Sequence, residues 1–238
     1  MTKKYELSGE SKNVFGLNLH RIVCVTAFAS VKVGELGGWI ESESNLSQTG
    51  DAWVSDEAWV SDNAKVSDNA LISGNAKVFG DAKVSGNAWV SDNAKVSGDA
   101  WVYGNAWVSD NAEVSCKAKV FDDAKVTGDA KVFGDAEVSD DAWVSGNAKV
   151  FGNAKVSDGV NVFGNAWVSG NAKVSGDATV SGNAEIFGNA KVFGDAWVSE
   201  NAKVFGEAVM FGNAKASGEA KLSGNAWLSG YAWVSENA

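Results

Sequence analysis

The sequence predicts an all-β fold, a single-stranded parallel β-helix, and three observations support this prediction. A six-residue repeat begins at Ala52 and continues without insertion or deletion to the last residue, forming 31 consecutive units that end at Asn237. Small or branched residues alternate with polar ones, as a strand with one buried face requires. Each unit closes on a Gly/Asp and Asn/Asp pair, residue types that favour sharp corners. A fixed short period indicates one structural unit stacked on copies of itself.

Within a unit, an alanine and a valine two positions apart share the inward face. The alanine is replaced once, by Val160, and the valine by a few other apolar residues. Strands with a corner every six residues close most naturally after three, which predicts a triangular coil of about 18 residues. About ten coils spaced by ~4.8 Å would form a rod on the order of 50 Å long.

The spacing of an aliphatic residue and a small residue four positions later, as in Val78 and Ala82, resembles the hexapeptide-repeat family of left-handed parallel β-helices. The resemblance implies left-handed winding. A bactofilin-type solenoid, also built on short repeats but wound the other way, stays open as the alternative because spacing alone does not fix handedness.

The first part of the chain lacks the repeat, so we divide the chain into an N-terminal β-hairpin cap, residues 1–39, and a β-helix, residues 40–238. Lys4–Ser8 and Leu17–Phe28 are expected to be strands, and Gly34–Gly38 a turn-rich hinge. A hairpin over the first coil would cover an otherwise open strand edge.

Winding is expected to begin near Gly38, before the strict repeat. Ile40 and Leu46 fall in phase with the later alanines, twelve and six residues before Ala52. We therefore expect them to occupy alanine positions of the first coil.

The segment from Leu19 to Val54 resembles the start of the YdcK-type family, bacterial and phage-associated β-solenoids labelled as acetyltransferases. The resemblance rests on His20–Ile22, Val33–Glu41 and Asn45–Ser47, followed by the hexads. It implies the fold, whereas the transferase label rests on the repeat itself.

Composition limits the classes of partner. A net charge of −10 argues against nucleic-acid binding and keeps a rod soluble. No apolar run approaches the ~18 residues that cross a membrane, and the start of the chain lacks a signal-peptide core, so we expect cytoplasmic residence without a membrane partner. Cys24 and Cys116 lie far apart and are expected to be reduced.

No catalytic residue, cofactor or metal ion is predicted. The 31 units contain no histidine, and His20, the one histidine of the chain, lies in the predicted cap. General-base catalysis needs a group that titrates near neutrality in a concave site. Corners with one or two carboxylates each provide too few oxygens for a tight calcium site.

Residues one predicted coil apart should stack on one face, so the outward positions form three columns. The column that starts at Trp53 has charged residues at 2 of 11 positions, whereas the other two together have them at 15 of 20. It contains six tryptophans, which we predict to form an interaction face: Trp53, Trp89, Trp107, Trp143, Trp197 and Trp233. Next to it, ten of eleven positions are Ser or Thr. Stacked aromatic residues could also act only as sheet stabilisers, through cross-strand contacts of roughly 0.2–1 kcal/mol per pair.

The C-terminal coil provides a second candidate surface. The sequence stops within a unit, and an uncapped coil would present unpaired backbone groups to a similar edge. We expect this open end to include Trp227, Trp233, Val234 and Ala238. Two rods could then meet tail to tail in a closed dimer.

Three functions follow from the sequence. The leading hypothesis is a non-enzymatic structural or interaction module that self-associates through the tryptophan column, the open end, or both. The alternative is an acidic, phage-type rod that mimics DNA and occupies the DNA-binding groove of a host protein. The third hypothesis is a hexapeptide-repeat acyltransferase.

Overall fold

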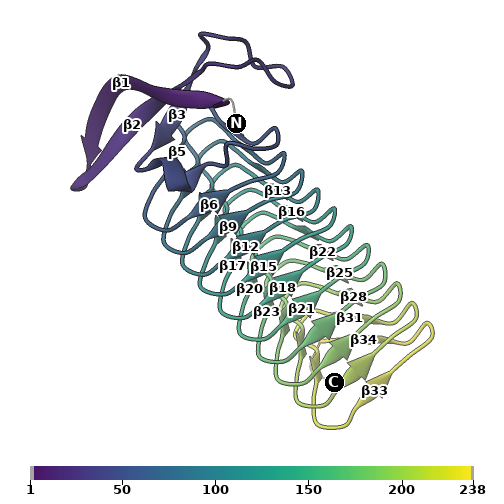
Figure 1. Ribbon diagram of the computed structural model, residues 1–238. Helices are drawn as coiled ribbons and strands as arrows, with labels where there is room; N and C mark the ends of the chain where they lie inside the picture. Colours follow the sequence, from purple (N-terminus) through teal and green to yellow (C-terminus); the bar gives the residue numbers. More distant parts are fainter. Residues whose placement is uncertain (1–2, 237–238) are drawn as a thin grey trace.

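The computed structural model describes residues 3–236 and confirms an all-β parallel solenoid. The chain winds into a straight rod with a β-hairpin at its N-terminal end (Figure 1). Strands one turn apart pair in parallel and in register, as Trp89 does with Trp107 and Val90 with Val108. Three sheets form the sides of the rod, and the 11 strands of one sheet indicate about 11 turns, one more than predicted.

The first sheet has 11 strands, and we call its outer surface the Trp face. Its strands are β4 (Trp53–Val54), β7 (Leu71–Ile72), β10 (Trp89–Val90), β13 (Trp107–Val108), β16 (Lys125–Val126), β19 (Trp143–Val144), β22 (Asn161–Val162), β25 (Thr179–Val180), β28 (Trp197–Val198), β31 (Lys215–Ser217) and β34 (Trp233–Ser235).

The second sheet has 13 strands because the N-terminal strands extend it, and we call its outer surface the cap face. Its strands are β1 (Tyr5–Val14), β2 (Leu17–Cys24), β3 (Leu36–Ile40), β5 (Trp59–Val60), β8 (Lys77–Val78), β11 (Lys95–Val96), β14 (Glu113–Val114), β17 (Lys131–Val132), β20 (Lys149–Val150), β23 (Trp167–Val168), β26 (Glu185–Ile186), β29 (Lys203–Val204) and β32 (Lys221–Leu222).

The third sheet has ten strands, and we call its outer surface the third face. Its strands are β6 (Lys65–Val66), β9 (Lys83–Val84), β12 (Trp101–Val102), β15 (Lys119–Val120), β18 (Glu137–Val138), β21 (Lys155–Val156), β24 (Lys173–Val174), β27 (Lys191–Val192), β30 (Val209–Met210) and β33 (Trp227–Leu228).

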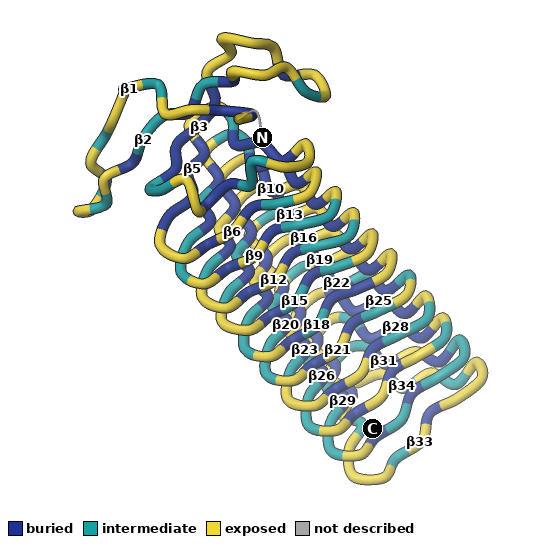
Figure 2. Tube along the Cα trace, in the orientation of Figure 1, coloured by how far each residue is buried: buried dark blue, intermediate teal, exposed yellow. Residues whose placement is uncertain are grey.

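The core is a narrow column of alanine and valine side chains inside the rod. Figure 2 shows that buried positions recur along the coils from one turn to the next. Nearly all of these residues are fully buried, including the exceptions Val160 and Met210. Each coil contributes three Ala–Val pairs, and identical side chains stack from one coil to the next. The alternation predicted from the sequence is therefore confirmed along the rod.

The corners explain the choice between glycine and aspartate. The fifth residue of every unit, counted from the alanine, has a positive φ, a conformation that costs little for glycine and is tolerated by aspartate. Asp110 has φ 59°, and its Oδ2 accepts a hydrogen bond of 2.9 Å from the amide of Gly128 in the next coil. The carboxylate thus satisfies a backbone donor that glycine would leave to solvent.

Asparagine side chains at the sixth position of the unit form hydrogen-bonded ladders from coil to coil, and each of the two ladders below ends on an Asp or a Glu. The Asn75 amide donates to the Asn93 carbonyl oxygen, Asn93 donates to Asn111, and Asn111 donates to Asp129 at 2.9 Å. A ladder from Asn147 ends in the same way on Glu219. A carboxylate can only accept, so it fits at the end of a row of donors. The Asn/Asp mixture that looks irregular in the sequence is therefore ordered in the structure, because the asparagine donors of a ladder all point toward its terminal carboxylate.

The cap differs in detail from its prediction. β1 continues to Val14, and β2 ends at Cys24 instead of Phe28 because the chain leaves the sheet in a loop over the rod. β3 pairs antiparallel with β2 and parallel with β5, so it joins hairpin and rod and crosses the predicted boundary after residue 39.

The phase predicted for the first coil is wrong. Ile40 pairs with Val60 and Leu46 with Val66, so both occupy valine positions instead of alanine positions. The reason is that Leu46 and Val54 lie eight positions apart, whereas the inward valines of successive later units lie six positions apart. Among the described residues, the one helical element is a 3₁₀ turn, η1 (Glu43–Asn45), at a corner of this coil.

Lys4 and Tyr5 fasten the hairpin to the first coil. The Lys4 ammonium donates to the Ala52 carbonyl at 2.7 Å and to the Gly50 carbonyl at 3.2 Å, and burial lowers the pKa of Lys4 to about 8. The Tyr5 hydroxyl donates to the Leu46 carbonyl at 2.7 Å, and burial raises its pKa. The cap is therefore held by buried polar contacts as well as by strand pairing.

Candidate functional site

The tryptophan column lies where the sequence predicts it. The outward residues of the Trp face stack in register from Trp53 to Trp233, including Trp89 on Trp107 and Lys215 on Trp233. Trp89, Trp107, Trp143 and Trp197 are 38–47% exposed, and Trp233 is 70% exposed. The column is thus an accessible strip along one flat side of the rod.

Trp53 is a correction to the predicted interaction face. Only 2% of this residue is exposed, because Phe28 and Tyr5 cover it with ring centroids at 5.5 and 6.4 Å. Within the described part of the chain, its indole nitrogen Nε1 is buried without a hydrogen-bond partner. Trp53 therefore anchors the cap, and the accessible strip begins beyond it.

The Ser/Thr column beside the tryptophans accepts hydrogen bonds from three of them. Trp89 Nε1 donates to Ser73 Oγ at 3.0 Å, Trp143 Nε1 to Thr127 Oγ1 at 2.9 Å, and Trp233 Nε1 to Ser217 Oγ at 2.9 Å. Each acceptor lies in the preceding coil, so the indoles lean toward the N-terminal end and are held in one orientation. The sequence offers this signal as a Ser or Thr sixteen positions before each of these tryptophans. The spacing becomes meaningful only once the coil length is known.

Two clefts of the same construction lie on the Trp face. In each, two tryptophans two coils apart form the walls and a lysine lies between them. One cleft, of about 390 Å³, has Trp107, Lys125 and Trp143 in its lining. The other, of about 180 Å³, has Trp197, Lys215 and Trp233.

Aromatic contacts keep the strip rigid. The rings of Trp89 and Trp107 stack at 5.4 Å with an interplanar angle of 6°, and the Lys215 ammonium lies 5.5 Å from the Trp197 ring. Stacking and cation–π contacts of this kind each stabilise by roughly 0.5–1.5 kcal/mol. The same rings can thus stabilise the sheet and remain available to a partner.

The other two faces are charged, and some of their lysines form ion pairs with glutamates of neighbouring coils. Glu113 lies between Lys95 and Lys131, with N–O distances of 3.3 and 2.9 Å. The hydrogen bond from Lys131, with that from Lys95, lowers the pKa of Glu113. Phe133 and Phe151 stack in parallel at 4.9 Å beside these rows. Such exposed ion pairs contribute little individually.

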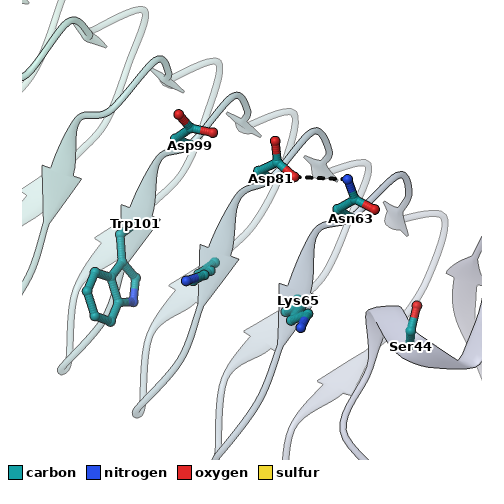
Figure 3. Close-up of a pocket in the computed structure, with 7 residues that line it drawn as sticks. Ser44, Asn63, Lys65, Asp81, Asp99 and Trp101 are labelled. Carbon is teal, nitrogen blue, oxygen red and sulfur yellow. Dashed lines mark hydrogen bonds between the residues drawn. The ribbon is translucent and has the colours of Figure 1, made fainter.

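A corner groove of about 610 Å³ lies near the cap (Figure 3). Asn63, Asp81 and Asp99 lie in a row along the corner, with the Asn63 amide donating to Asp81 at 3.0 Å. Lys65, Lys83 and Trp101 form the neighbouring row, and Ser44, which belongs to η1, lies at one end of the groove.

The side chains of this groove can both donate and accept hydrogen bonds, but the lining contains no nucleophile paired with a base. The Ser44 hydroxyl is 2.7 Å from the Ser42 hydroxyl, and no histidine lines the groove. Sequence reasoning missed the groove. Its signal is an acidic corner column beside a Lys/Trp column, both repeating once per coil.

The residues considered for chemistry are dispersed. His20 lies on β2, opposite Ser11 and Ile40 in the cap sheet, and away from the groove lining. Cys24 is buried, Cys116 is exposed at a corner, and neither forms a disulfide. Across residues 3–236, no group of three or more His, Cys, Asp or Glu side chains has a metal-binding arrangement.

The predicted open end lies in the last strands. Trp227 is on β33, and Trp233 and Val234 are on β34, each the last strand of its sheet among the described residues. Ala238 lies outside the described residues. None of the helices described here is long and apolar enough to span a membrane.

Comparison with known proteins gives a short local sequence similarity. No family model matches the chain. The chain is 38% identical over 53 residues to the uncharacterized acetyltransferase YdcK of Escherichia coli (strain K12). The matched segment is 22% of this chain and 15% of YdcK, so it spans a small part of that relative's length. Together with the fold, this similarity supports at most a hexapeptide-repeat-like family.

Proposed function

We propose that the chain is a non-enzymatic interaction module that self-associates through the Trp face. The observation that carries the proposal is the accessible strip of aligned tryptophans on a flat and rigid side of the rod. Tryptophan is enriched at the centres of protein interfaces, and contiguous exposed apolar strips mark association surfaces. Because Trp89, Trp143 and Trp233 are already oriented by hydroxyl groups, these three side chains would lose little entropy on binding.

The Trp face also has the low charge density that association requires. Each rod carries a net charge of −10, which opposes close approach of two copies. The outward column of this face has two charged residues, Lys125 and Lys215, whereas the other two faces carry rows of lysines. Two copies would therefore meet with the least desolvation of charge on this side.

Light scattering on two matched triple variants tests the proposal. The first variant replaces Trp89, Trp107 and Trp143 on the Trp face with lysine. We expect the intact chain to be a dimer or larger, and this variant to be monomeric, because buried ammonium groups would be left without partners.

The control variant replaces Trp101, Trp167 and Trp227, exposed tryptophans of the other two faces, with lysine. It changes net charge and tryptophan content equally, and it should associate like the intact chain. A monomeric intact chain would refute self-association and favour a foreign partner. Loss of association in both variants would implicate charge or, through Trp227, the open end, and not the Trp face.

An acyltransferase is the second candidate, supported by the local similarity to YdcK and by the corner groove. Such an enzyme must bind an acyl donor. We expect no heat of binding when acetyl-coenzyme A is titrated into the intact chain. Binding that is lost in a Lys83→Ala, Trp101→Ala double variant, with both residues in the groove, would favour the enzyme over the interaction module.

The DNA-mimic alternative is supported by one corner. Asp122, Asp140 and Asp158 follow one another there, and Asp123 and Asp141 lie beside them. Coils repeat every ~4.8 Å along the rod, against a rise of about 3.4 Å along the helix axis per phosphate of one DNA strand. Three Asp residues in successive coils form only a short row of carboxylates, so we rank this alternative below self-association.

A further inference from the structure

The two clefts of the Trp face are related by a fixed translation. Trp197 lies five full turns after Trp107, and Lys215 lies five full turns after Lys125. Each cleft therefore has a Trp–Lys–Trp sequence along the rod, and a tryptophan of either cleft lies five turns from its equivalent.

The walls of each cleft are far enough apart for one aromatic ring once the lysine side chain between them moves aside, since the Lys215 ammonium lies 5.5 Å from the Trp197 ring. The walls are two coils apart, or about 9.6 Å. A ring held between two others needs about 7–8 Å, twice the contact distance of roughly 3.5–4 Å. The lysine between the walls would place its ammonium beside the inserted ring, which favours an indole.

We propose that two copies of the chain pair antiparallel through the Trp face, with Trp197 of each copy inserted between Trp107 and Trp143 of the other. This inference rests on the proposed function and specifies its geometry. In an antiparallel pair, facing positions have a constant sum of residue numbers. If Trp197 faces Lys125, the sum is 322, and Trp107 then faces Lys215. One two-fold operation therefore fills both clefts, as a closed isologous interface requires.

The remaining positions fit the same register. Trp143 faces Thr179, and Asn161 lies on the two-fold axis opposite its own copy. Trp89 and Trp233 form the one remaining facing pair of tryptophans. In a parallel pair, by contrast, every tryptophan would face itself and both clefts would stay empty.

Two neighbouring registers fit less well. A sum of 268 places Lys215 of the second copy over Trp53, where Phe28 already lies. With a sum of 358, Trp143 of one copy, instead of Trp107, faces Lys215 of the other copy. Trp89 and Trp107 then have no facing residues, so the overlap is two coils shorter. The register with sum 322 is the longest that fills both clefts and avoids the cap.

The overlap is large enough for a specific but modest dimer. Nine coils span about 43 Å, and the face is about 12 Å wide, which gives roughly 1,000 Å² of buried surface for the two copies. Specific interfaces begin near this area. Because both rods are acidic, dimerisation should strengthen as added salt screens their repulsion.

Spin labels can determine orientation and register. In a Cys116→Ser background, Cys24 is buried, so a nitroxide reacts at one introduced cysteine. Lys155 lies six residues from Asn161, so labels at Lys155→Cys would be about 3 Å apart along the rod axis. Labels at Lys83→Cys would be about 42 Å apart along it. We expect the distance from pulsed electron paramagnetic resonance to be clearly shorter at Lys155 than at Lys83.

Equal distances at the two sites would show a parallel pair and overturn the inference while self-association stands. A shorter distance at Lys173→Cys than at Lys155→Cys would show the register with sum 358 and also overturn it. Absence of dipolar coupling together with a monomeric mass would refute the proposed function itself. As an independent check, Trp197→Ala should weaken dimerisation at least tenfold, whereas Trp167→Ala, a similarly exposed tryptophan on the cap face, should not.

Discussion

Gly38→Val is expected to separate the cap from the first coil and to lower the free energy of unfolding by about 3 kcal/mol. A Cβ atom at Gly38 would lie 2.6 Å from the Ala58 carbonyl oxygen and 2.8 Å from Val54 Cγ1. The Ala58 oxygen cannot move aside, because it accepts the amide of Trp39 at 2.9 Å. β3 must therefore shift away from β5, and with it the hairpin that covers Trp53.

The two cysteines provide the measurement. Cys116 is exposed and should react with a thiol reagent in both proteins, whereas buried Cys24 should react only in Gly38→Val. Gly159→Val is the matched control, since Gly159 also lacks a positive φ and its Cβ would meet mainly the movable carboxylate of Asp177. A protected Cys24 and an unchanged unfolding midpoint in Gly38→Val would disprove the close approach.

Ala124→Leu is expected to interrupt the rod at its middle. The Ala124 side chain is fully buried in a column of alanines, and the coils above and below leave only ~4.8 Å per layer. Overpacking a close-packed core costs about 1–3 kcal/mol, and here the strain falls on both neighbouring coils. Because each coil contacts only its neighbours, the two halves should lose cooperativity.

Urea unfolding followed by circular dichroism should show a lower midpoint and a broader transition for Ala124→Leu. Amide exchange should increase most in the coils next to residue 124. Val126→Ile is the matched control, because isoleucine already occupies this inward position at Ile72 and Ile186. If both variants unfold like the original chain, the core is wider than the structure indicates.

The antiparallel pairing has a consequence for chains with other repeat numbers. Removing one full coil, which is three units, keeps every side chain on its face, whereas removing a single unit moves all later side chains to the next face. Both changes preserve the Ala/Val core. Only a coil-sized change would therefore keep the later tryptophans on the Trp face.

The sequence by itself determined the solenoid, because its two periods are local properties. Alternation of Ala and Val with polar residues defines the buried side, and a corner every six residues defines the coil. The exposed tryptophan column follows from these two periods, and it is confirmed from Trp89 to Trp233. Its role as an interaction face stays a prediction.

The tertiary structure decided what depends on contacts between segments far apart in sequence. The two additional residues before Val54 shift Ile40 and Leu46 into valine positions, and the loop at Phe28 removes Trp53 from the surface. The hydrogen bonds from tryptophans to hydroxyl groups and the asparagine ladders connect neighbouring coils. The clefts are likewise lined by residues from several coils. Such contacts appear only when the chain has wound, because stacking, and not the order of residues within a unit, brings these side chains together.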